Sequence, residues 1–190
     1  MPTPRRALPT LLALPLGVAA ATFSVGAPSI GPDGAIPTDH TCQGRNRSPA
    51  LRFAAAPPGA RSLALLLEDP DAHAPERPPV SFVHWVLYDL PPSCQGLPEG
   101  LLAEDLPAGT REGLNDKGEE GYFGPCPQEG RHRYHLHLYA LDRRLGEGAP
   151  LSGDGLRRAM EGHVLAEAEL VFSYERQNRF MARLKRLFGR

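Results

Sequence analysis

Short apolar runs separated by turn-forming residues recur along the chain, and they predict strands more than helices. The run over 62–67 is continuously apolar, as in a buried strand, and 82–90 is rich in valine and aromatic residues. Over 133–141 the pattern alternates, so that Tyr134, Leu136 and Leu138 face one way while Arg133, His135, His137 and Tyr139 face the other. With weaker runs at 51–54 and 165–174, the pattern predicts a mostly β chain.

Between these strands the sequence predicts loops and one short helix. The helix is expected over 156–162 and ends at Gly162. Residues 95–130 hold many glycines and show little periodicity, which indicates a long loop region with short elements at most. A loop of this length in a compact domain is usually functional or flexible. A second loop, over 72–79, is rich in proline and charge.

Composition supports this interpretation and narrows the range of partners. The chain has 190 residues, enough for one domain with a proper core, which we place at 22–176. Its 20 glycines and 21 prolines suit a β domain with many turns. With 21 basic and 22 acidic residues, the net charge of -1 provides no overall attraction to nucleic acid, so we expect no nucleic-acid partner.

The first 21 residues have the pattern of a signal peptide. Arg5 and Arg6 precede an apolar stretch that ends in three alanines, and cleavage is expected after Ala21. The predicted location is then periplasmic or secreted. The alternative is a mis-assigned start, with translation beginning near Val18 and a cytoplasmic protein.

The last residues, 177–190, are predicted to form a basic amphipathic helix. From Arg176 onward the chain carries six basic residues and no acidic one. The apolar residues recur at helical spacing: Phe180, Met181, Leu184, Leu187 and Phe188. Such a helix either docks on the sheet or makes a weak contact with an anionic membrane surface.

The three cysteines, Cys42, Cys94 and Cys126, lack the spacing of a zinc site. If the protein is exported, one disulfide can link two loops, and the sequence leaves the pairing open. Cys126 lies between two prolines, which argues against an activated thiol and favours a structural role.

Polar groups that can carry chemistry gather at the ends of the predicted strands. Asp69 and Asp71 directly follow the run at 62–67, and His84 lies near the start of the next strand. Further along, the glycine-rich segment 121–127 precedes His132 and Tyr134. A carboxylate beside an imidazole favours the protonated, cationic histidine. Together with a tyrosine hydroxyl and the N–H groups of a glycine-rich loop, these residues predict an anion-binding pocket.

Other interpretations of these residues remain open. Two aspartates and two histidines can hold a metal that activates water, although no dense ligand motif is present. His135 and His137 place two imidazoles on one strand face, a weak metal signal against a plain solvent-facing surface. Asp71 is as well suited to stabilise a turn as to contact a ligand. The sequence contains no nucleophile-elbow motif of a serine hydrolase.

The order of several short motifs resembles the phosphatidylethanolamine-binding protein family, closest to its bacterial Raf-kinase-inhibitor-like (YbhB/YbcL-type) branch. The matching segments run from Phe23 to Arg176: 41–44 with 48–49, 65–72, 83–86, 124–127, 132–134, 138–142 and 161–163.

The resemblance implies a Greek-key pair of antiparallel sheets with a few short peripheral helices and an anion pocket. The implied ligand-binding residues are Asp69, Asp71, His84, Gly124, Pro125, His132 and Tyr134. It implies no cofactor, no metal and no catalytic residue. The sequence departs from the family at 72–75, where two inserted residues change the near rim of the pocket.

The function predicted from residues and resemblance together is non-enzymatic binding of a small anionic ligand, either phosphate-like or a phospholipid headgroup. Relatives modulate kinases or proteases, so a protein kinase or protease is a candidate partner, and a homodimer is left open. The alternatives are a serine protease inhibitor acting through its surface and, as a minority view, a metal-assisted hydrolase.

Overall fold

The structure, a computed structural model, describes residues 22–72, 81–146 and 148–176. Its strands are β1 (Val25–Gly26), β2 (Leu51–Phe53), β3 (Ser62–Asp69), β4 (Phe82–Leu90), β5 (Gly96–Leu97), β6 (Arg111–Glu112), β7 (Arg131–Leu141) and β8 (Val164–Glu175). Its helices are α1 (Gly153–Met160) and two 3-10 turns, η1 (Thr38–His40) and η2 (Ala103–Asp105). The predicted signal peptide and C-terminal helix lie outside the described residues.

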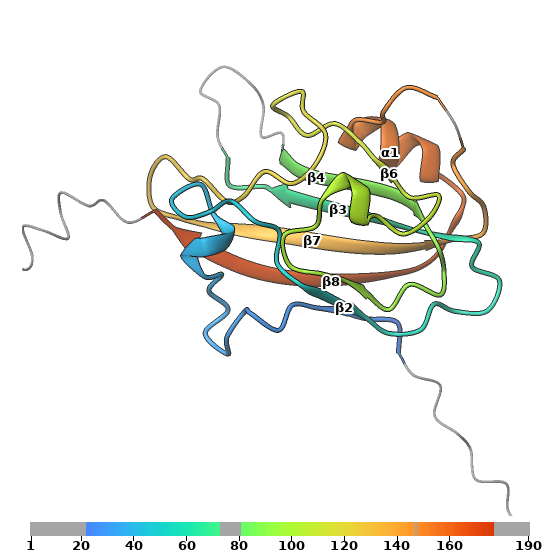
Figure 1. The fold of residues 1–190 in the computed structure, drawn as a ribbon, viewed down its shortest axis with the longest axis horizontal. Helices are drawn as coiled ribbons and strands as arrows, with labels where there is room; N and C mark the ends of the chain where they lie inside the picture. The colour runs from blue at the N-terminus through green and yellow to red at the C-terminus, as the bar shows by residue number, and fades with distance from the viewer. Residues whose placement is uncertain (1–21, 73–80, 147, 177–190) are drawn as a thin grey trace, which may run out of the picture.

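The strands form two antiparallel sheets, which confirms the predicted fold class. The large sheet has the order β6-β4-β3-β7-β8, and the small sheet has the order β1-β2-β5. In Figure 1 the long strands β4, β3, β7 and β8 of the large sheet run side by side. β3 lies at the centre of the large sheet and is buried on both faces, which explains why its run is continuously apolar.

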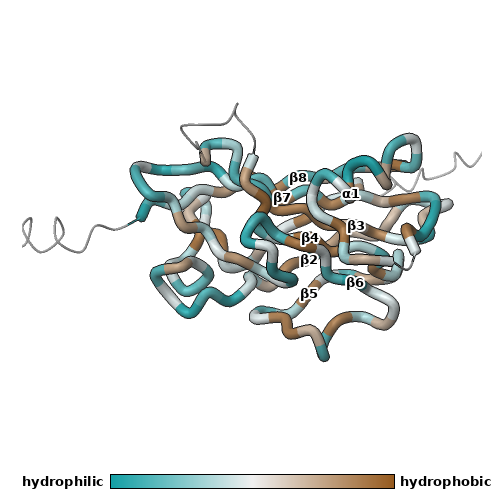
Figure 2. Tube along the Cα trace, turned by 90° about the horizontal axis from the view of Figure 1, so that it is seen from above, coloured by the Kyte–Doolittle hydropathy of each residue, from teal (hydrophilic) through white to brown (hydrophobic). Residues whose placement is uncertain are grey.

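The main core lies between the two sheets. One face of the large sheet supplies alternate residues of β3, β4, β7 and β8, and the small sheet supplies Leu51, Phe53 and Leu97. Figure 2 shows apolar positions concentrated along the strands, with polar residues in the connecting loops. As predicted, Tyr134, Leu136 and Leu138 point into this core. The opposite face of β7 carries His135, His137 and Tyr139.

The second face of the large sheet is partly covered by α1. Leu156 and Met160 of this helix pack on a smaller cluster that includes Leu66, Val86 and Tyr88. The helix begins at Gly153, three residues before the predicted start, because the Ser152 side chain accepts a hydrogen bond from the Gly155 N–H. It ends at Met160, two residues before the predicted end. Within the described residues, no helix is both long and apolar enough to cross a membrane.

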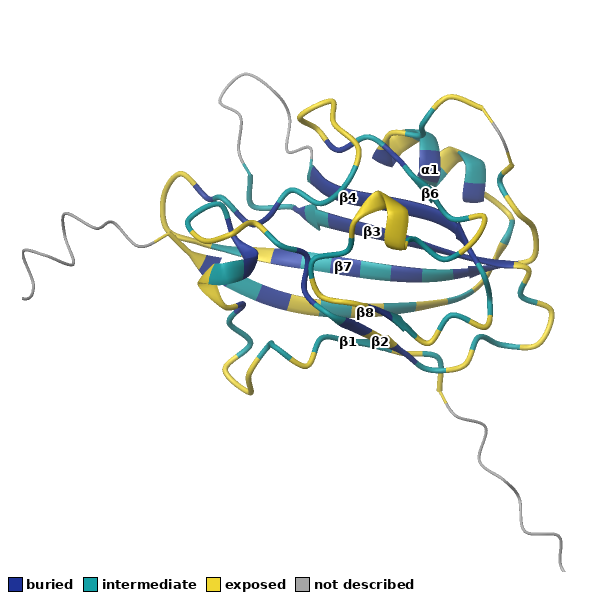
Figure 3. Cartoon of the chain, viewed as in Figure 1, coloured by how far each residue is buried: buried dark blue, intermediate teal, exposed yellow. Residues whose placement is uncertain are grey.

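Several strands are longer than predicted, and the difference matters for the site. β3 continues through Glu68 and Asp69, and β7 starts at Arg131, so that Asp69 and His132 are strand residues. β4 spans 82–90 as predicted, and the predicted loop region 95–130 contains only the short elements β5, η2 and β6. In Figure 3, β3 and β4 are buried along nearly their whole length, whereas more buried and more exposed residues alternate along β7 and β8.

Candidate functional site

Most of the predicted site residues meet at one end of the large sheet, where antiparallel strands begin and end side by side. The end of β3, the start of β4, the start of β7 and the end of β8 all lie there, at the left-hand end of the strands in Figure 1. Asp69 pairs with Phe82 across β3 and β4, and His132 pairs with Tyr174 across β7 and β8. A pocket of about 810 Å³ opens at this end of the sheet. Its lining residues include Asp69, Asp71, His84 and His132.

Asp69 orients the other groups of the pocket. It is the last residue of β3 and is buried. Its Oδ2 lies 2.8 Å from His132 Nδ1, and its Oδ1 accepts a hydrogen bond from the Asp71 N–H at 2.9 Å. With both carboxylate oxygens engaged, Asp69 fixes the His132 ring and leaves Nε2 as the ring nitrogen that can face a ligand.

His84 is held in one tautomer inside an aromatic cage. Its Nδ1 lies 2.7 Å from the Phe123 carbonyl oxygen, which can only accept, so Nδ1 carries the proton. The ring centroid lies 4.8 Å from that of Phe82, 5.6 Å from that of Phe123 and 5.3 Å from that of Tyr134. Burial lowers the pKa of His84 to about 4.

For His84 the lowered pKa departs from the expectation of a cationic histidine. At neutral pH the His84 imidazole is uncharged, and its Nε2 is an acceptor. Desolvation is the largest influence on this pKa, and the attraction of Asp69 is smaller. Within this site His84 therefore receives a proton from a ligand or becomes charged only when an anion binds beside it.

A stability measurement tests this assignment. Because the folded-state pKa of His84 lies near 4 and an ordinary histidine titrates near 6.5, the unfolded chain binds more protons between these values. Stability from this group is therefore lost as pH falls, by about 2 kcal/mol between pH 7 and pH 5. We expect urea unfolding to show that loss in the wild type and a smaller loss in His84→Asn, which keeps a donor near the Nδ1 position. An equal loss in both proteins contradicts the assignment.

Tyr134 lies behind the pocket lining. Its ring stacks on Phe172 at a centroid distance of 5.6 Å and meets His84 edge-on. Its hydroxyl is buried and forms no hydrogen bond of good geometry among the described residues, although the Asp69 carboxylate and the Cys126 backbone lie near it. Burial and the nearby Asp69 carboxylate raise the pKa of Tyr134, so the hydroxyl stays protonated. A buried donor without a partner is rare in folded proteins, and a bound ligand or water would satisfy it.

Asp71 is engaged by an arginine. Its carboxylate accepts from the Arg133 N–H at 2.9 Å and from the guanidinium at 2.9 and 2.7 Å. This pairing holds the pKa of Asp71 far below its usual range. Asp71 lines the pocket as predicted, with its charge balanced by Arg133.

The loop 121–127 forms one wall of the pocket and is fixed to the rest of the domain. Phe123 donates its N–H to the His84 carbonyl, and Gly124 donates to Asn46 Oδ1 at 2.8 Å. A Cβ on Gly124 would lie 2.4 Å from the His40 carbonyl oxygen, so the close approach requires glycine. Gly124 and Pro125 back this wall and are not among its lining residues.

A disulfide anchors the same wall. Cys42 and Cys126 form the bond, which agrees with the structural role predicted for Cys126, while Cys94 is free. The Cys42 N–H also donates to the Pro125 carbonyl at 3.2 Å. Cys126 and the residues that follow it line the pocket: Pro127, Gln128 and Glu129.

The sequence interpretation did not select several other lining residues. Phe82 shares its strand face with His84, and this two-residue spacing was a usable signal. Lys117 and Arg176 bring two basic groups from distant parts of the chain, and Lys117 Nζ lies 5.3 Å from the Phe123 ring centroid. Glu129 adds an acidic group. The pocket is therefore a mixed-charge site rather than a purely basic one.

The chain is thus a two-sheet antiparallel β domain with a pocket built on an aspartate–histidine pair at one end of its large sheet. Comparison with known proteins identifies its family. Residues 26–175 match the family model described as phosphatidylethanolamine-binding protein, and the chain belongs to that family.

Relatives and solved structures agree with this assignment. A UPF0098 protein of Methanothermobacter thermautotrophicus is 46% identical over 144 residues, covering 75% of this chain and 92% of the relative. A UPF0098 protein of Chlamydia muridarum is 42% identical over 153 residues, covering 80% and 94%.

Two crystal structures are similar in fold. That of CT736, a phosphatidylethanolamine-binding protein homolog from Chlamydia trachomatis, has a TM-score of 0.75 and 36% identity, covering 82% of this chain and 98% of that one. That of Escherichia coli YbcL has a TM-score of 0.74 and 28% identity, covering 83% and 100%.

Proposed function

We propose that the pocket binds a small phosphorylated ligand, such as a phospholipid headgroup, without chemical conversion. One observation carries the proposal: the Asp69–His132 pair and neutral His84 line a single pocket, and the ring of buried Tyr134 meets that of His84 behind the lining. With Nδ1 bonded to Asp69, His132 in its protonated form donates its Nε2–H to a phosphate oxygen. His84 Nε2 accepts the proton of a monoprotonated phosphate.

The mixed charge of the pocket favours a zwitterionic ligand over a bare anion. Lys117 and Arg176 suit the phosphate, and Glu129 suits an ammonium group. A phosphoethanolamine group carries both charges, and the name of the family is consistent with it.

The contacts of the pocket support binding rather than catalysis. The Cys126 sulfur is in the disulfide and provides no nucleophile. Within the described lining there is no serine or threonine. Asp69 has each carboxylate oxygen in a hydrogen bond, to the Asp71 N–H and to His132, and these contacts suit a positioning role.

Isothermal titration with a small panel of ligands tests the proposal. We expect O-phosphoethanolamine to bind more tightly than inorganic phosphate, and ethanolamine alone to show no binding, because the phosphate supplies most of the polar contacts. An assay with p-nitrophenyl phosphate and a generic ester runs beside it. The absence of heat with every phosphorylated ligand overturns the proposal, and chelator-sensitive turnover supports the hydrolase alternative instead.

A further inference from the structure

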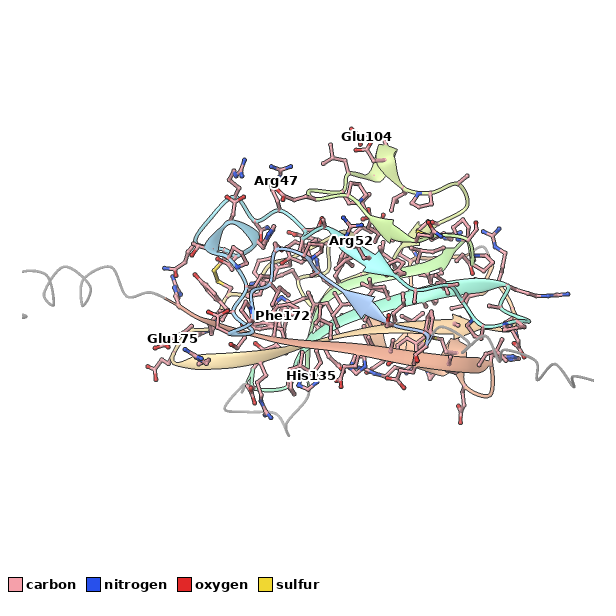
Figure 4. All side chains as sticks on the ribbon, turned by 90° about the horizontal axis from the view of Figure 1, so that it is seen from below. Arg47, Arg52, Glu104, His135, Phe172 and Glu175 are labelled. Atoms are coloured by element: carbon pink, nitrogen blue, oxygen red, sulfur yellow. A yellow bond between two sulfur atoms is a disulfide. The ribbon has the colours of Figure 1, made fainter. Side chains whose placement is uncertain are left out.

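A second cluster of metal-ligating groups lies on the face of the large sheet that points away from the small sheet. His135 and His137 are two residues apart on β7, so both side chains project from this face. Glu169 of β8 is the direct cross-strand partner of His137. Figure 4 shows His135 on the side of β7 and β8 away from Arg52 of the small sheet. The cluster is thus separated from the pocket by the sheet.

The three side chains converge on one point. Their ligand atoms all lie within 4.8 Å of one another. Glu169 Oε1 is 2.6 Å from His135 Nδ1 and 3.8 Å from His137 Nε2. Ligands of a tetrahedral zinc ion at its usual bond lengths lie roughly 3.4 Å apart, so small side-chain adjustments bring all three into range.

A neighbouring carboxylate prepares His137 to bind a metal. Glu167 Oε1 lies 2.9 Å from His137 Nδ1, and a hydrogen bond there places the proton on Nδ1. Nε2 is then the nitrogen that can ligate a metal ion, and it faces Glu169 and Glu68. A carboxylate that orients a ligating histidine through its other nitrogen is the usual support of protein zinc sites.

The charge around the cluster also favours a cation. Three glutamates surround the two histidines, since Glu68 Oε1 lies 3.4 Å from His137 Nε2. Arg157 is a basic side chain near the cluster, and its charge is paired with Glu68 and Asp154. Metal ligation requires neutral imidazoles, and the carboxylates then leave an excess of negative charge that a divalent ion balances.

We propose that His135, His137 and Glu169 form a binding site for a divalent transition metal of the zinc class. Nitrogen and carboxylate ligands suit Zn²⁺, and the fourth coordination position is left to water. Glu167 is a positioning residue that acts through His137. The site is independent of the ligand pocket and of the function proposed for it.

Titration of the full, tag-free chain with Zn²⁺ tests the site. We expect one equivalent to bind at about neutral pH, with affinity lowered at least about tenfold in His137→Ala and about 10- to 100-fold in Glu167→Gln. Because His137→Ala removes a partly buried ring, Glu169→Gln, which keeps size and shape, is the second ligand variant, and circular dichroism checks each fold. Bound zinc should also raise the melting temperature of the wild type.

Two controls make the result specific. His163→Ala removes a histidine that is likewise paired with a carboxylate, Asp142, but has no second imidazole beside it, and it should bind zinc as the wild type does. The double variant His84→Asn/His132→Asn should also retain zinc binding. The proposal is overturned by no binding at 100 µM Zn²⁺, by equal affinity in the ligand variants, or by loss of binding in the pocket variant.

Discussion

Replacing His132 with asparagine should lower the affinity for O-phosphoethanolamine by about 10- to 100-fold, because a hydrogen bond to a charged group contributes about 1.5–3 kcal/mol. The asparagine amide can replace Nδ1 as the donor to Asp69, so the change removes mainly Nε2 from the pocket. His84→Asn should act in the same way, since its amide can keep the bond to the Phe123 carbonyl. Isothermal titration measures both variants against the wild type.

The matched control for these variants is His163→Asn, which changes a partly exposed histidine that pairs with Asp142 and does not line the pocket. Its ligand affinity should equal that of the wild type. If all three variants bind alike, the phosphate does not contact His84 or His132 and the site assignment fails.

Removing the disulfide should have the largest effect on stability. The bond between Cys42 and Cys126 spans 84 residues of sequence, and the loss of a native disulfide typically costs about 2–5 kcal/mol. Cys42→Ser/Cys126→Ser should therefore lower the free energy of unfolding by that amount, as measured by urea denaturation. The same variant should weaken ligand binding, because Cys126, Pro127 and Glu129 line the pocket.

Cys94→Ser serves as the control, because Cys94 is outside the disulfide and serine can keep the hydrogen bond that the thiol donates to the Gly96 carbonyl. We expect it to retain the ligand affinity of the wild type. Unfolding of the double serine variant at the same urea concentration as the wild type would show that the link does not stabilise the domain. Ligand affinity that is unchanged in a folded double variant would show that the wall at 126–129 is held by other contacts.

Much of the fold could be predicted because each long strand has a strong local pattern. β3 is apolar along its length since both of its faces are covered, and β7 alternates since only one face enters the main core. The exact ends of the strands are harder to predict from the sequence. Glu68 and Asp69 are polar residues inside a strand, and a polar pair next to Pro70 reads as a turn until the neighbouring strand is known.

The site was predictable in part for a similar reason. Asp69, His84 and His132 stand beside recognisable strands, and the antiparallel order brings those strand ends together. Lys117 and Arg176 reach the pocket through tertiary contacts that no local pattern encodes. The neutral state of His84 also depends on packing, because it follows from burial beneath aromatic rings. Modulation of a kinase or a protease remains a prediction.

The central claim is that a phosphorylated ligand contacts His84 and His132, and imidazole NMR tests it most directly. Long-range nitrogen–proton spectra of the wild type are recorded while O-phosphoethanolamine is added. The account predicts that the Nε2 signals of His84 and His132 shift together and saturate with the affinity found by calorimetry, while those of His135, His137 and His163 stay in place. Saturable binding that leaves the His84 and His132 signals unmoved would contradict it.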